Sequence, residues 1–127
     1  MHILIVDDKQ PILDLVSGML TKSGHTVDVA LNGLDAFEKT KNKDFDLFII
    51  DHLMPLMNGI QLSKNIQLHE RSQRKPIIFM TTQDVKTLNL SAVAELFFEI
   101  ISKPIDESHF MKVISQLNIE NTLCHSL

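Results

Sequence analysis

Polar and charged residues stand at the ends of four short apolar runs in this sequence, and they are the groups best suited to carry chemistry. They are Asp7-Asp8 after residues 3–6, Asp51 after 47–50, Thr81-Thr82 after 77–80, and Lys103 just beyond 97–101. Carboxylates bind divalent cations, and a hydroxyl and an ammonium can contact the oxygens of a transferred phosphoryl group. If the four runs are strands of one parallel sheet, these residues meet at its carboxyl edge.

Three carboxylates at one edge would repel one another strongly. Two unit charges ~4 Å apart repel by about 4 kcal/mol at an effective dielectric of about 20. That repulsion corresponds to about three pK units, enough to protonate one carboxyl group near neutral pH. A divalent cation removes the conflict, and an all-oxygen site with water favours Mg²⁺. A carboxylate, Mg²⁺, an ammonium and a hydroxyl that converge on one point are what an aspartyl-phosphate site requires.

The elements that must position these residues alternate between strand-like runs and helix-like spacing. Strands are predicted at 3–6, 26–30, 47–50, 77–80 and 97–101. The spacing predicts helices that begin near Pro11, after an Asn32-Gly33 turn, after Asn58-Gly59, at an Asp84 cap and before Phe110, with a frayed tail from Asn118 onward. Five strands alternating with five helices predict an α/β fold, a doubly wound parallel sheet with helices on both faces.

The composition is typical of one compact domain. The chain has 127 residues, of which 44% are hydrophobic and 22% charged, as is usual for a globular domain. The one cysteine, Cys124, excludes a disulfide framework, and no apolar run reaches the roughly 18–20 residues of a membrane span. We therefore expect a cytoplasmic protein. A net charge of −4, with neither Trp nor Tyr, argues against nucleic acid as a partner.

Four motifs, in order and over essentially the whole chain, resemble the receiver domain of two-component response regulators, the CheY-like family. The motifs are Ile3-Leu4-Ile5-Val6-Asp7-Asp8, Asp51-His52-Leu53-Met54-Pro55-Leu56-Met57-Asn58-Gly59, Pro76-Ile77-Ile78-Phe79-Met80-Thr81-Thr82 and Ser102-Lys103-Pro104. The resemblance implies a flavodoxin-like sheet with strand order 2-1-3-4-5. It also implies a receiver domain over residues 1–120, a C-terminal tail over 121–127 and no output domain.

By this resemblance Asp51 is the phosphoacceptor. Asp8 and Asp51 are then direct Mg²⁺ ligands, together with the backbone carbonyl of Leu53, while Asp7 acts largely through water. A histidine kinase or a phosphotransfer protein supplies the phosphoryl group, and an unknown downstream protein receives the signal. The domain is not an enzyme, beyond catalysing its own phosphorylation and dephosphorylation, and neither nucleic acid nor a membrane is a partner.

The resemblance assigns three more residues to the phosphoryl group. Thr81 is the hydroxyl switch residue, and Lys103 binds the phosphoryl group, with a cis peptide bond before Pro104. Thr82 stands where alanine is usual in the family and is still small enough to admit the phosphoryl group.

Two departures from the family pattern bear on how a signal leaves the site. Leu96-Phe97 stand where Gly-Ala is common, and Ile100 stands where an aromatic ring usually swings between exposed and buried positions. A β-branched side chain such as Ile100 has few rotamers. We therefore expect the signal to leave through the backbone of residues 82–84 and the fourth helix.

The same departures favour an alternative function, a receiver-like interaction module that is not phosphorylated. The complete set of acidic residues and lysine argues against that alternative. A phosphatase of the haloacid dehalogenase type also uses an aspartate nucleophile. That family requires a second aspartate where this chain has Leu53, and we exclude it on this ground.

Simpler explanations also exist for single residues. Asp7 and Asp8 could cap the helix that follows them. Phe97-Phe98 would fill the core from both faces of a strand. His52 follows Asp51 directly, and its neighbouring position is expected to direct it away from the carboxylates.

Overall fold

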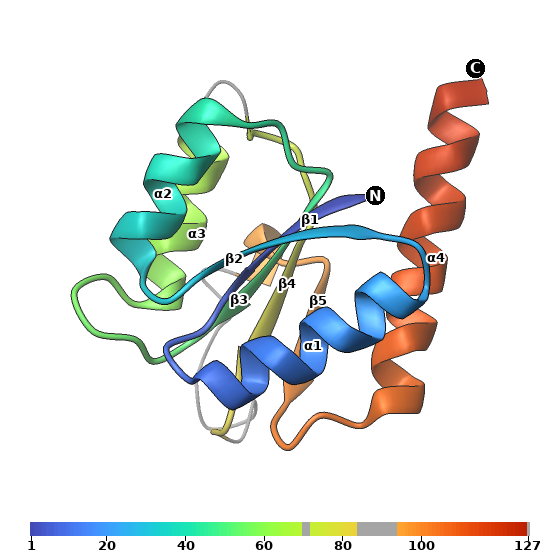
Figure 1. Ribbon diagram of the computed structural model, residues 1–127. Coiled ribbons are helices and arrows are strands. Elements are labelled where there is room, and N and C mark those ends of the chain that lie inside the picture. Colours follow the sequence, from blue (N-terminus) through green and yellow to red (C-terminus); the bar gives the residue numbers. More distant parts are fainter. Residues whose placement is uncertain (70–71, 84–93, 127) are drawn as a thin grey trace.

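The computed structural model describes residues 1–69, 72–83 and 94–126, in which five parallel strands form one sheet (Figure 1). The strands are β1 (His2–Val6), β2 (Thr26–Ala30), β3 (Leu47–Asp51), β4 (Ile77–Thr81) and β5 (Glu99–Ser102). Their spatial order is β2-β1-β3-β4-β5. This order confirms the doubly wound, flavodoxin-like sheet that the sequence predicted.

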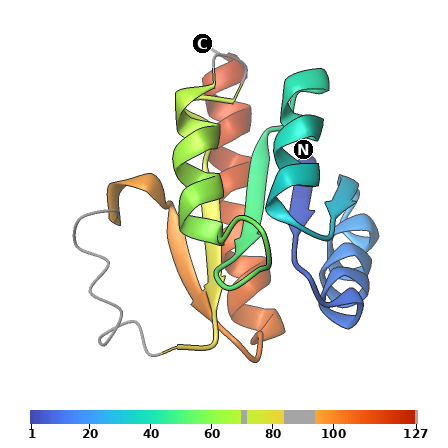
Figure 2. The ribbon, with the colours of Figure 1, turned by 90° about the vertical axis from the view of Figure 1, so that its left-hand side faces the viewer.

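Helices cover both faces of the sheet. They are α1 (Gln10–Lys22), α2 (Gly33–Asn42), α3 (Gly59–Leu68) and α4 (Glu107–Ser126), with a short 3₁₀ helix, η2 (Ala94–Leu96). α1 and α4 pack on one face, and α2 and α3 on the other, so that in Figure 2 α3 lies in front of the sheet and α4 behind it. The predicted helix that Asp84 would cap lies outside the described residues. Among the residues described, no helix is long and apolar enough to cross a membrane.

Both faces of the central strands are buried, which explains their continuous apolar runs. On β1, Ile3 and Ile5 pack beneath α1 and α4, whereas Leu4 and Val6 pack beneath α2 and α3. β2 lies at one edge and is only partly buried, which agrees with its alternating sequence. Each apolar run therefore ends where its strand leaves the core, and the next residues are placed at the carboxyl edge.

Two predicted boundaries differ from the structure. Asn32-Gly33 is not a free turn, because Asn32 is the N-cap of α2 and its side chain accepts a hydrogen bond from the N–H of Asp35 at 2.8 Å. The tail is not frayed at Asn118, because α4 continues to Ser126. No glycine or proline follows Pro104, so the sequence contains no strong helix stop in this segment.

The fifth strand begins later than predicted, at Glu99 instead of Phe97. The N–H of Phe97 donates to the carbonyl of Ala94 at 3.2 Å, so this residue belongs to the preceding turn. The ring of Phe97 packs against the core formed with α2 and α3, but Phe98 is 39% exposed. The expectation that both rings fill the core is therefore wrong for Phe98. The Lys103–Pro104 peptide bond is cis, as expected.

Gly59 allows α3 to begin directly against the end of β3. A Cβ atom added at this position would lie 2.1 Å from the carbonyl oxygen of Asp51 and 3.0 Å from the ring of Phe79. The Gly59 N–H also donates to the carbonyl of His52 at 2.8 Å. The absence of a side chain here thus brings the helix and the strand end of Asp51 together.

We predict that Gly59→Ala lowers the free energy of unfolding by about 1–3 kcal/mol, because the added methyl group forces α3 away from β3. The matched control is Gly18→Ala in α1, where an added Cβ meets nothing within 4 Å. That control should raise stability by up to about 1 kcal/mol, since alanine is the better helix former. Urea unfolding followed by circular dichroism measures both changes. Equal stability of Gly59→Ala and wild type would contradict the close approach.

Candidate functional site

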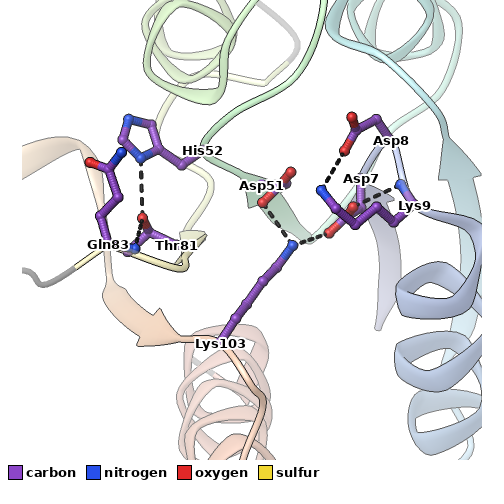
Figure 3. Close-up of polar contacts among 8 residues, drawn as sticks. All are labelled: Asp7, Asp8, Lys9, Asp51, His52, Thr81, Gln83 and Lys103. Carbon is purple, nitrogen blue, oxygen red and sulfur yellow. Dashed lines mark hydrogen bonds and ion pairs between the residues drawn. The ribbon is translucent and has the colours of Figure 1, made fainter.

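Four of the predicted site residues meet at the carboxyl edge of the sheet. Asp7 and Asp8 directly follow β1, Asp51 is the last residue of β3, and Lys103 follows β5. β1 and β3 are neighbours, with Val6 paired to Ile50, so the carboxylates that come next lie side by side. Lys103 extends from the end of β5 past β4 to reach both strands (Figure 3).

The Lys103 ammonium bridges two buried carboxylates. Its Nζ lies 2.6 Å from Asp7 Oδ2 and 2.8 Å from Asp51 Oδ1. The exposed fractions of these three side chains are 7%, 0% and 6%. A buried ammonium with two carboxylate partners forms strong charge-assisted hydrogen bonds. One positive charge is thus shared between two negative ones.

The pKa values of Asp51 and Lys103 are both raised, for different reasons. Burial raises the pKa of the Asp51 carboxyl group, and the charge of Asp7 adds to that rise, while Lys103 opposes it. Burial lowers the pKa of Lys103, but its hydrogen bonds to Asp51 and Asp7 outweigh burial, so the net shift is upward. Lys103 therefore stays charged, and Asp51 ionises less readily than an exposed aspartate.

Asp7, Asp8 and Asp51 can together hold a metal ion. One carboxylate oxygen from each lies within 4.8 Å of the others. Asp51 Oδ2 is buried and has no hydrogen-bond partner in the described part of the chain, so it is an acceptor that a cation would satisfy. Oxygen-only ligands suit a hard divalent cation such as Mg²⁺ or Ca²⁺. The donor set therefore fits such an ion.

The interpretation of Asp7 and Asp8 as helix caps finds no support in these contacts. The N-cap of α1 is Lys9, and its side chain makes no capping hydrogen bond. Asp7 Oδ1 accepts the N–H of Lys9 itself at 2.9 Å, and Asp8 forms an exposed ion pair with the Lys9 ammonium at 3.3 Å. Both side chains thus stay at the edge of the sheet with Asp51.

Thr81 ends β4, and its hydroxyl is directed away from the carboxylates (Figure 3). Its Oγ lies 3.1 Å from Nδ1 of His52 and accepts the N–H of Gln83 at 3.1 Å. Thr82, the next residue, is exposed. Ile100, on β5, is paired with Phe79 of β4 and is only partly buried.

His52 points away from Asp51, as expected, but it contacts Thr81, the predicted switch residue. This contact was not predicted from the sequence. The strand pairing could have revealed this contact. Asp51 is paired with Met80, so the next residues of the two strands, His52 and Thr81, also lie side by side. The His52 ring is buried, and this burial lowers its pKa.

Comparison with known proteins places the chain in a family. A family model for the response regulator receiver domain matches residues 3–115. PilH of Pseudomonas aeruginosa is 31% identical over 114 residues, which cover 90% of this chain and 94% of PilH. A CheY homologue of Campylobacter jejuni is 34% identical over 106 residues, 82% of either chain. The chain therefore belongs to the response regulator receiver domain family.

Solved structures agree with this assignment. CheY4 of Vibrio cholerae, a chemotaxis response regulator, superimposes with a TM-score of 0.84 at 27% identity, over 91% of this chain and 97% of that one. The receiver domain of a Pseudomonas aeruginosa sensor histidine kinase, solved with magnesium in its active-site cleft, has the same fold, with a TM-score of 0.81 at 20% identity over 91% and 95% of the two chains. This protein is a CheY-like receiver domain of two-component signal transduction.

The chain spans only part of some relatives. It covers 58% of a probable transcriptional regulator, ycf29, of Porphyra purpurea, at 26% identity. It covers 4% of hybrid signal transduction histidine kinase G of Dictyostelium discoideum, at 32% identity. Receiver domains thus occur both in short proteins and inside longer ones, and in either setting they are signalling modules.

We predict that Asp51→Asn raises the free energy of unfolding at neutral pH in metal-free buffer, and that this gain shrinks on acidification. Burial makes the pKa of Asp51 higher in the folded than in the unfolded protein. The folded state therefore binds the proton more tightly, and wild type loses stability as pH rises through the folded pKa. Asparagine carries no proton to lose and escapes that penalty.

Thermal unfolding in EDTA over a range of pH, followed by circular dichroism, measures the difference. Asp14→Asn on the exposed face of α1 removes the same charge outside the site and is the control. A gain for Asp51→Asn that is absent at neutral pH, or that grows on acidification, would contradict the stated cause.

Proposed function

We propose that Asp51 accepts a phosphoryl group from a histidine kinase or phosphotransfer protein, in a reaction that depends on Mg²⁺. The observation that carries this proposal is the free, buried oxygen of Asp51 beside Lys103 and two further carboxylates. An attacking carboxylate needs an available lone pair and nearby cations that neutralise the phosphoryl oxygens. Both requirements are met at Asp51.

In the proposed reaction one carboxylate oxygen of Asp51 attacks phosphorus, and the other stays beside the cations. The P–O bond to Asp51 forms as the P–N bond of a phosphohistidine breaks, and the imidazole leaves with the electron pair. Lys103 is already 2.8 Å from the other oxygen of Asp51, so its ammonium needs little movement to contact the incoming phosphoryl group. Thr82 leaves room for the group, and the Thr81 hydroxyl is the donor that must turn toward it.

Asp8, Asp51 and the backbone carbonyl of Leu53 would hold the Mg²⁺ ion directly, and Asp7 would act largely through water. The ion would neutralise the charge that develops on the phosphoryl oxygens. Lys103 is hydrogen-bonded to Asp7 Oδ2 and the Lys9 N–H to Oδ1, which leaves Asp7 less free than Asp8 to bind a metal directly.

The domain would have no substrate of its own beyond the phosphodonor, and it would catalyse only its own phosphorylation and dephosphorylation. A downstream protein would read the phosphorylated state in the cytoplasm. The net charge of −4 disfavours nucleic acid as that target. A receiver-like module that is never phosphorylated would have no need for a buried Asp51–Lys103 pair, so we favour phosphorylation.

Incubation with acetyl phosphate and Mg²⁺ should add one phosphoryl group, seen as a single increment in the intact mass. Asp51→Asn should abolish the increment, because the amide nitrogen and oxygen are poor nucleophiles. Asp14→Asn should be labelled as wild type is. Labelling of Asp51→Asn at another residue would overturn the assignment, and no labelling of wild type would favour the interaction module.

Mg²⁺ should stabilise the folded protein by linkage, by about 1.4 kcal/mol at a concentration tenfold above its dissociation constant. Asp8→Ala should remove most of that gain, because it deletes a direct ligand. Calorimetry or circular dichroism must be used, since the chain has no Trp. An identical Mg²⁺ response in Asp8→Ala and wild type would rule Asp8 out as a ligand, and Asp14→Ala serves as the control.

A further inference from the structure

His52 holds the Thr81 hydroxyl through a buried contact between the ends of two neighbouring strands. Nδ1 of His52 and Oγ of Thr81 are 3.1 Å apart. The backbone N–H of Gln83 donates to the same hydroxyl oxygen at 3.1 Å. Figure 3 shows the Thr81 hydroxyl directed toward these two groups, while the Asp51 carboxylate and Lys103 lie on the other side of the β3 end.

The His52 ring is itself fixed by aromatic packing. Its centroid lies 5.1 Å from that of Phe79, with a 50° angle between the ring planes. Phe79 in turn stacks on Phe97, with centroids 4.4 Å apart and planes 19° apart. A ring held on a stacked pair has little rotational freedom to lose, so its hydrogen bond forms at low entropic cost.

A hydroxyl group has one proton to donate. If Thr81 donates that proton to Nδ1, none remains for a phosphoryl oxygen. If Thr81 instead accepts from Nδ1, its proton is free, but two donors hold its oxygen on the side away from Asp51, as Figure 3 shows. In either case Thr81 must leave His52 before it can bond a group on Asp51.

We infer that His52 is a positioning residue that holds Thr81 in its unphosphorylated orientation and thereby sets how readily phosphorylation produces the response. This inference rests on the proposed function of Asp51. The contact lowers the fraction of molecules whose Thr81 is free to turn, so the apparent affinity for a phosphoryl group falls by the same factor. Removal of the contact raises that affinity without any new bond to the ligand.

Beryllofluoride with Mg²⁺, a phosphoryl mimic, is the probe. His52→Phe keeps a ring on Phe79 but deletes Nδ1, and it should bind beryllofluoride about two- to tenfold more tightly than wild type, the factor expected from one hydrogen bond. Calorimetry measures the affinity, and the amide chemical shift of Gln83 reports the release of Thr81. His52→Leu also lacks a hydrogen-bonding atom and should show the same gain if the phenylalanine variant folds poorly.

Three controls separate this role from a merely structural one. His52→Asn places an amide near the position of Nδ1 and should restore the wild-type affinity. In a Thr81→Ala background, His52→Phe should have no further effect, because the residue it acts through is gone. His109→Phe, on the exposed face of α4, should leave the affinity unchanged.

The outcomes distinguish the inference from the proposed function. Failure of wild type to bind beryllofluoride would overturn both. Normal binding by wild type, with unchanged affinity in His52→Phe and His52→Leu, would overturn the role of His52 alone. A gain that persists in the Thr81→Ala background would also overturn it, since His52 would then act through another group.

Discussion

One ammonium group shared by two buried carboxylates is the interaction on which the rest of the site depends. Lys103 contacts both Asp7 and Asp51, and removal of this shared ammonium would leave two buried carboxylates uncompensated at high cost. Even with Lys9 counted against Asp8, the three carboxylates exceed the two cations by one negative charge. That surplus explains why an oxygen of Asp51 remains without a partner, and why the cluster suits a divalent cation. The cluster therefore carries excess negative charge that a bound cation would neutralise.

The strand order of the sheet brings these charged residues together. β1 and β3 must be neighbours for Asp7 and Asp51 to share one lysine, and β5 must lie where a lysine side chain can reach across the end of β4. Strands buried on both faces fix the register that makes this possible, because a shift by one residue would turn each polar end toward the opposite face. Gly59 completes the arrangement, since any side chain there would meet the carbonyl of Asp51.

Much of the fold and most of the acidic edge could be predicted from the sequence because their signals are local. An apolar run that stops at Asp51 indicates both a buried strand and its carboxyl end, and this signal does not depend on residues far away in the sequence. Asn32-Gly33 reads as a turn but is the start of α2, because the same dipeptide occurs in both settings and only the helix that follows distinguishes them. Phe97 lies in an apolar run but belongs to a turn, because its N–H donates to the carbonyl of Ala94. Its ring stacks on Phe79 of β4, a contact that a local pattern does not predict. The contact between His52 and Thr81 depends on strand register and side-chain rotamers, which no periodicity encodes.

Two consecutive residues at the end of β3, Asp51 and His52, make contacts on opposite sides of the strand. Successive side chains on a strand point to opposite sides, so Asp51 faces Lys103 and the carboxylates while His52 faces Thr81 (Figure 3). A hydrogen bond between neutral groups contributes about 0.5–1.5 kcal/mol, whereas one to a charged group contributes about 1.5–3 kcal/mol. A phosphoryl group on Asp51 would therefore outcompete His52 for the Thr81 hydroxyl, but by a small margin. A small margin means that the His52 contact tunes the balance between the two orientations and does not lock either one.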